Sequence, residues 1–144
     1  MSSTAISSEM LSKREALMQD ANVLRTALER KDHDYDHSQK LSTLRLAAGS
    51  FRRHLERLLF LERKEEYLRL FPDSQPSLRS QAGQLDQEHM QICQALNQLI
   101  RRLNDLSPTD HVGYGYISDE LASLLERVDR HCNQETELLE KALL

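Results

Sequence analysis

The sequence contains no tryptophan and has little glycine or proline. Its 144 residues include four glycines, three prolines and 5% aromatic residues. Glycine and proline interrupt helices, so their scarcity leaves room for long helical segments. The helix-favouring residues leucine, glutamate, arginine, glutamine and alanine are abundant. The composition predicts an all-α protein with one domain over residues 1–144, of which residues 1–8 are expected to be a flexible N-terminus.

The chain also lacks long apolar runs and any excess of positive charge. No window approaches the ~20 apolar residues that span a membrane, and the opening MSSTAISSEM has neither the basic nor the apolar part of a signal peptide. A net charge of −4 argues against non-specific nucleic-acid binding. Cys93 and Cys132 are too few for a disulfide framework and are expected to be buried thiols. We therefore expect a cytoplasmic protein that binds neither nucleic acid nor membrane. Its oligomeric state is left open.

Four segments have apolar residues at steps of three and four, the spacing of one helix face. The predicted helices cover about 8–31, 42–70, 78–106 and 118–144. Pro72 is expected to end the second, whereas Ser77 and Ser118 are expected to cap the third and fourth. Four such helices predict an up-down-up-down four-helix bundle. The segment 107–118, with two glycines and a proline, is predicted to be the one long loop and a candidate lid or partner contact.

Polar residues interrupt the apolar stripes near one end of this bundle. His131 and Glu135 stand where the spacing of the last helix requires leucine, and His89 interrupts the third helix in the same way. Buried polar groups need a hydrogen bond, a counter-charge or a metal ion. These three residues therefore indicate a polar layer inside the core.

The second helix adds acidic residues to the same end. Its stripe, continued by the same steps, reaches Glu62 and then Glu65 or Glu66, and Glu62 and Glu66 are one turn apart, as are the histidine and glutamate of the last helix. Four-helix bundles build metal sites from such inward-facing pairs, and imidazole with carboxylate suits iron, manganese or zinc. The alternative is a hydrogen-bonded layer without metal. The candidate metal ligands are Glu62, Glu66, His89, His131 and Glu135.

Three stretches, LERKEEYLRLFP, QEHMQICQALNQL and DRHCNQETELLEKAL, resemble the hemerythrin-like family, also called HHE cation-binding domains. The family has H-x-x-x-E before L-[FY]-P in its second helix, EHxxI in its third and H-x-x-x-E in its fourth. The resemblance implies a hemerythrin-like bundle with two non-haem iron ions. In that arrangement Glu66 and Glu135 bridge the ions, while His89 and His131 are terminal ligands.

The chain departs from this family pattern at three positions. Glu62 stands where the second helix of the family has histidine, Ala21 where the first helix has one, and Cys93 where some members have another. The resulting carboxylate-rich shell resembles a ferritin-type site and argues against reversible oxygen transport. We expect metal handling, or sensing of O2, peroxide or nitric oxide, and not an enzyme. The alternatives are a metal-free interaction module that has lost the site, and a di-metal oxidase or peroxidase.

The second predicted helix also carries a run of basic residues on an acidic protein. Most such runs are solvated helix faces supported by neighbouring acidic residues, but this one is also a candidate docking surface for an acidic protein partner. The residues are Arg45, Arg52, Arg53, Arg57, Arg63, Lys64 and Arg69.

Overall fold

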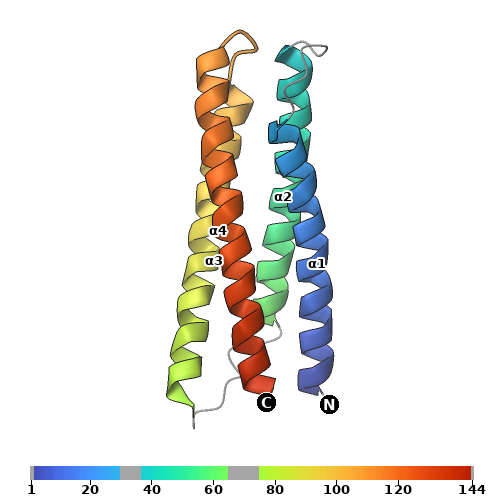
Figure 1. Ribbon diagram of the computed structural model, residues 1–144, viewed down its shortest axis with the longest axis vertical. Helices are drawn as coiled ribbons and strands as arrows, with labels where there is room; N and C mark the ends of the chain where they lie inside the picture. Colours follow the sequence, from blue (N-terminus) through green and yellow to red (C-terminus); the bar gives the residue numbers. More distant parts are fainter. Residues whose placement is uncertain (1, 30–36, 65–74, 144) are drawn as a thin grey trace.

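Four long helices make up the described part of the chain in the computed structural model, which describes residues 2–29, 37–64 and 75–143 (Figure 1). They are α1 (Ser2–Glu29), α2 (His37–Lys64), α3 (Pro76–Asp105) and α4 (His111–Leu143). These ranges contain no strand, so the predicted all-α four-helix fold is confirmed. No helix within them is both long and apolar enough to cross a membrane.

Neighbouring helices run antiparallel. Arg14 of α1 contacts Glu135 near the end of α4, whereas Arg25, further along α1, contacts Asp129, earlier in α4. In Figure 1, α1 and α3 rise from the lower end of the bundle, and α2 and α4 descend toward it. The early part of α1, the early part of α3 and the late part of α4 therefore share one end.

The predicted apolar stripes meet along the bundle axis. Side chains spaced by three and four residues lie on one helix face, and burying each large one contributes about 1.5–3 kcal/mol. Cys93 and Cys132 are buried free thiols, as predicted. The core includes Leu17, Ala21, Leu24, Leu44, Ala48, Phe51, Leu55, Leu58, Ile92, Leu96, Leu99, Leu103, Leu121, Leu124 and Val128.

Two helix starts differ from the sequence-based expectation. α1 begins at Ser2, so residues 2–8, expected to form a flexible N-terminus, have helical backbone. α3 begins at Pro76, with Gln75 as its N-cap and no side-chain hydrogen bond at the cap. The prediction that Ser77 caps α3 is therefore wrong: proline already has the helical φ angle and lacks the N–H that a cap would satisfy.

The end of α3 is capped by a basic residue of α2. Arg45 donates hydrogen bonds to the carbonyl oxygens of Leu103 and Leu106 at 3.1 and 2.9 Å, and to that of Asn104 at 3.2 Å. The last carbonyls of a helix have no partner within it and carry partial negative charge. Arg45 thus holds α2 against α3, so at least this member of the basic run has a structural role.

The predicted long loop 107–118 is wrong, because α4 begins at His111. Asp110 acts as the N-cap: its Oδ1 accepts a hydrogen bond from the backbone N–H of Gly113 at 2.8 Å. This carboxylate satisfies an orphan donor of the first turn, and both glycines of the segment are tolerated inside the helix. Ser118, the expected cap, lies within α4. Residues 111–118 are therefore helical, and the long loop on which the candidate lid rested is absent.

Candidate metal centre

Four polar side chains are buried in the part of the chain whose side chains the structure describes, and all four belong to one cluster. Arg14 of α1 is 4% exposed, His89 of α3 is 1% exposed, and His131 and Glu135 of α4 are each 2% exposed. Buried polar groups are unfavourable unless they satisfy one another or a bound ion. We call these four residues the polar layer.

The two α4 residues of the polar layer are one helical turn apart, which places both on one face. His131 Nε2 contacts Glu135 Oε1. The other ring nitrogen of His131, Nδ1, donates a hydrogen bond to Glu88 Oε1 of α3 at 2.8 Å. His131 therefore lies between two carboxylates, one buried and one partly exposed.

His89 approaches the same carboxylate from α3. Its Nδ1 lies 4.0 Å from Glu135 Oε1, and its ring meets that of His131 edge-on, with 5.2 Å between centroids. The backbone of Leu55 in α2 also interacts with His89 and raises its pKa. The polar layer thus has neighbours on all four helices, with α1 contributing Arg14.

The donor atoms of this cluster fit a metal ion. One atom each of His89, His131 and Glu135 lie within 4.8 Å of one another. Two ligands of a single zinc ion, each about 2.1 Å from it, are at most about 4.2 Å apart. His89 would therefore have to move closer, and the touching atoms His131 Nε2 and Glu135 Oε1 would have to separate to admit an ion. Two imidazoles and a carboxylate are also the donor types that iron, manganese and zinc accept.

Arg14 adds a cation that the sequence analysis missed. Its Nη2 lies 2.7 Å from Glu135 Oε2, and its Nη1 donates to Thr136 Oγ1 at 3.1 Å. The signal was present in the sequence: position 14 continues the stripe of Leu17 and Ala21 by one step, so the arginine interrupts that stripe as His89 interrupts the stripe of α3.

Burial and charge move the two histidines in opposite directions. Burial lowers the pKa of His89 from its ordinary 6.5 to about 4, and the charge of Glu135 offsets only part of this effect. Burial also acts to lower the pKa of His131, but hydrogen bonds and charge interactions with Glu135 and Glu88 outweigh it and raise that pKa. His89 is therefore neutral at pH 7, the form that binds metal, whereas His131 binds its proton more tightly.

The structure brings together three of the five predicted ligands: His89, His131 and Glu135. Glu66 lies outside the described residues, and so does the side chain of Glu62. Ala21, aligned by the resemblance with the first-helix histidine of the family, is fully buried in the apolar core. α1 reaches the polar layer through Arg14 instead.

The remaining described histidines lie outside the polar layer. His54 pairs at the surface with Asp20, with 3.0 Å between Nδ1 and Oδ2. His37 packs against His111 and Tyr114, with ring centroids 4.1 and 4.9 Å away. Both contacts join two helices, and neither involves a candidate ligand.

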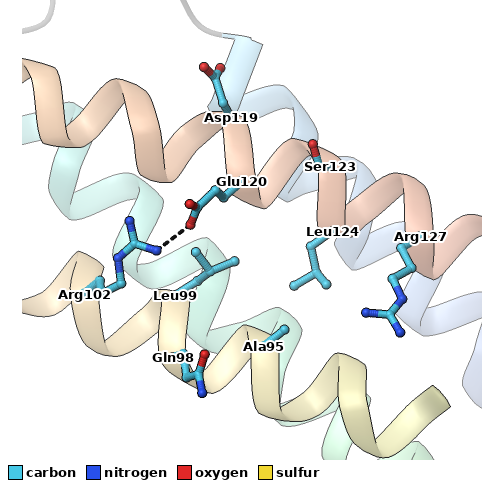
Figure 2. A pocket seen from close by; sticks show the side chains of 9 residues that line it. All are labelled: Ala95, Gln98, Leu99, Arg102, Asp119, Glu120, Ser123, Leu124 and Arg127. Atoms are coloured by element: carbon cyan, nitrogen blue, oxygen red, sulfur yellow. Dashed lines mark hydrogen bonds and ion pairs between the residues drawn. The ribbon is translucent and has the colours of Figure 1, made fainter.

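The grooves between α3 and α4 include two that lie alongside the middle and one end of these helices. One, of about 350 Å³, is lined by Glu88, the partner of His131, and by Glu137. The other, of about 450 Å³, has apolar lining from Ala95, Leu99 and Leu124, and Arg102 points to Glu120 across it (Figure 2). Of these two grooves, the first therefore touches the surroundings of the polar layer.

The chain was compared with known proteins. No protein-family model, no curated protein and no solved structure matches it. The hemerythrin-like resemblance therefore stays a prediction from the three motifs.

Proposed function

We propose that this protein binds a divalent transition metal ion through His89, His131 and Glu135. The observation that carries the proposal is the convergence of their three ligand atoms within 4.8 Å in a fully buried cluster. Non-haem iron is the preferred ion because two histidines and one carboxylate are the ligand set typical of non-haem Fe(II) sites, and manganese and zinc are the alternatives.

The surroundings of His131 support this proposal. Metal-binding histidines usually donate their second ring N–H to a carboxylate, which fixes the ring and makes the other nitrogen a better ligand. Glu88 accepts such a bond from His131 Nδ1, so Nε2 is the nitrogen directed at Glu135. The protein thus supplies an oriented imidazole as well as the ligand atoms.

Bound iron or manganese would supply redox chemistry inside the bundle. The chain would then serve metal handling, or sensing of O2, peroxide or nitric oxide. In either role His89, His131 and Glu135 bind the ion, Glu88 orients a ligand, and the apolar core around them excludes bulk water.

The test is metal analysis of chelator-stripped protein reconstituted anaerobically with Fe²⁺ and desalted. We expect stoichiometric iron in the parent and its loss in His131→Gln. His54→Gln is the matched control, because it removes a histidine that lies outside the polar layer, and it should retain iron. Failure of the parent to take up iron, manganese or zinc when it is reconstituted with each ion separately would overturn the proposal.

A second candidate, a metal-free interaction module, is favoured by the charges of the polar layer. Arg14 and a protonated His131 would provide two positive charges for the carboxylates of Glu135 and Glu88, so these charges balance without a metal ion. The function would then lie in binding a protein partner, for example through exposed arginines of α2. The same reconstitution distinguishes the candidates, because this one requires a parent that takes up no metal.

A further inference from the structure

The two carboxylate oxygens of Glu135 face different groups. Oε1 contacts His131 and lies 4.0 Å from His89 Nδ1, whereas Oε2 lies 2.7 Å from the guanidinium of Arg14. A glutamate that bridges two metal ions offers one oxygen to each of them. In this chain the second oxygen is already held by an organic cation.

We propose that Arg14 takes the place of a second metal ion beside Glu135, so that the polar layer holds one divalent ion and not two. The inference rests on the proposed function, since it concerns how many ions the same residues bind. It departs from the two-ion centre that the hemerythrin-like resemblance implies.

The position of Arg14 is fixed by its neighbours. Its second terminal nitrogen donates to Thr136 Oγ1, and that hydroxyl donates in turn to the carbonyl oxygen of Cys132 at 2.9 Å. The hydroxyl proton is therefore directed away from the guanidinium, and the oxygen accepts from it. Hydrogen bonds to both Glu135 and Thr136 hold the arginine in one orientation.

The charge of Arg14 is permanent, because a guanidinium is not deprotonated in proteins. A second dication at Oε2 would have to displace it and leave a buried charge without its partner, which is strongly unfavourable. Repulsion between charges is also screened weakly in a buried site. Arg14 therefore excludes a second ion and weakens the binding of the first.

The test measures Co²⁺ binding to chelator-stripped protein, with the dissociation constant taken from competition with a chromophoric chelator and the count from elemental analysis. Arg14→Gln removes the charge and Arg14→Lys keeps it. Arg25→Gln is the matched control, because Arg25 also joins α1 to α4, through Asp129 at 2.8 Å, outside the polar layer.

We expect one equivalent of Co²⁺ in the parent, in Arg14→Lys and in Arg25→Gln. In Arg14→Gln the first ion should bind at least about tenfold more tightly, because the repelling charge is gone. Arg14→Lys should bind Co²⁺ with an affinity close to that of the parent.

Two equivalents in the parent, or equal dissociation constants in Arg14→Gln and Arg25→Gln, would overturn the role of Arg14 and leave metal binding intact. No Co²⁺ binding by the parent would overturn the proposed function and this inference together. The count in the parent depends on no variant, so it decides the question even if Arg14→Gln folds poorly.

Discussion

Arg14 and Glu135 form a buried ion pair that joins α1 to α4 inside the bundle, with 2.7 Å between Nη2 and Oε2. Their side chains are 5% and 2% exposed, so neither charge keeps its hydration. Removing one member of such a pair leaves an uncompensated buried charge. The packing of α1 against α4 therefore depends in part on the ion pair between Arg14 and Glu135.

Replacing Arg14 by methionine should destabilise the metal-free protein by about 3–5 kcal/mol, because Glu135 loses its buried counter-charge. Arg25→Met should cost about 1 kcal/mol or less, since the pair between Arg25 and Asp129 is one-third exposed and screened by solvent. Urea unfolding in the presence of a chelator, followed by circular dichroism, measures both. Equal losses would show that burial does not strengthen the Arg14 pair.

Glu88 should control metal affinity more than stability. Its carboxylate accepts the hydrogen bond of His131 Nδ1 but is 32% exposed, so Glu88→Ala should lower the free energy of unfolding by only about 1 kcal/mol. Loss of such an orienting carboxylate typically weakens metal binding about 10–100-fold. Glu137→Ala, which changes the same groove, is the control. The orienting role fails if both variants bind Co²⁺ like the parent.

The two histidines of the polar layer should titrate far apart in metal-free protein. Because the pKa of His89 lies near 4, below its ordinary 6.5, the unfolded chain binds this proton more tightly, and the contribution of His89 to stability is lost as pH falls from 6.5 toward 4. The raised pKa of His131 has the opposite sign: its contribution is present below its ordinary pKa and is lost as pH rises through the raised value.

Proton NMR in the presence of a chelator can check this difference. The ring signals are assigned with His89→Gln and His131→Gln. His89 should show no titration between about pH 8 and about pH 5.5, whereas His131 should titrate above the usual midpoint near 6.5. A His89 midpoint near 6.5 would contradict the burial argument.

The helices and their core faces were predictable because burial repeats along a helix with a period near 3.6 residues. Leu44, Phe51 and Leu58, for example, lie on the predicted stripe of α2 and are buried. The start of α4 was not predictable by the same rule. There Asp110 supplies a cap that outweighs the unfavourable helix propensity of two glycines. The proline and glycines of this segment predicted a loop, because the sequence alone does not show that Asp110 makes this hydrogen bond.

The candidate site was predictable where a polar residue interrupts an apolar stripe. His89, His131 and Glu135 were found in this way, and Arg14 met the same criterion but was passed over. Glu88 gives no such signal, because it lies beside the stripe and is recognised only from its contact with His131. The spacing of apolar residues identifies which residues face the core. To predict a contact between side chains of two helices, such as that of Glu88 with His131, the relative positions of the helices must be known.

The two glycines at the start of α4 should respond to alanine with opposite signs. A β-carbon at Gly113 would lie 2.5 Å from Asp110 Oδ2 and 2.8 Å from Leu106 Cδ1, whereas one at Gly115 would meet nothing within 4 Å. Gly113→Ala must therefore displace the capping carboxylate and should destabilise the protein by about 1 kcal/mol. Gly115→Ala should stabilise it by about 0.5–1 kcal/mol, because alanine loses less backbone entropy in a helix.

Urea unfolding of the two variants measures this contrast. Repeating both substitutions in Asp110→Ala protein identifies the cause of the Gly113→Ala penalty. In Asp110→Ala protein the cap is already lost, so adding Gly113→Ala should cost less than it does in the parent, while the gain from Gly115→Ala should be unchanged. An equal cost of Gly113→Ala in both backgrounds would assign the penalty to Leu106 instead of the cap. Stabilisation by Gly113→Ala in the parent would show that Asp110 does not hold the first turn of α4.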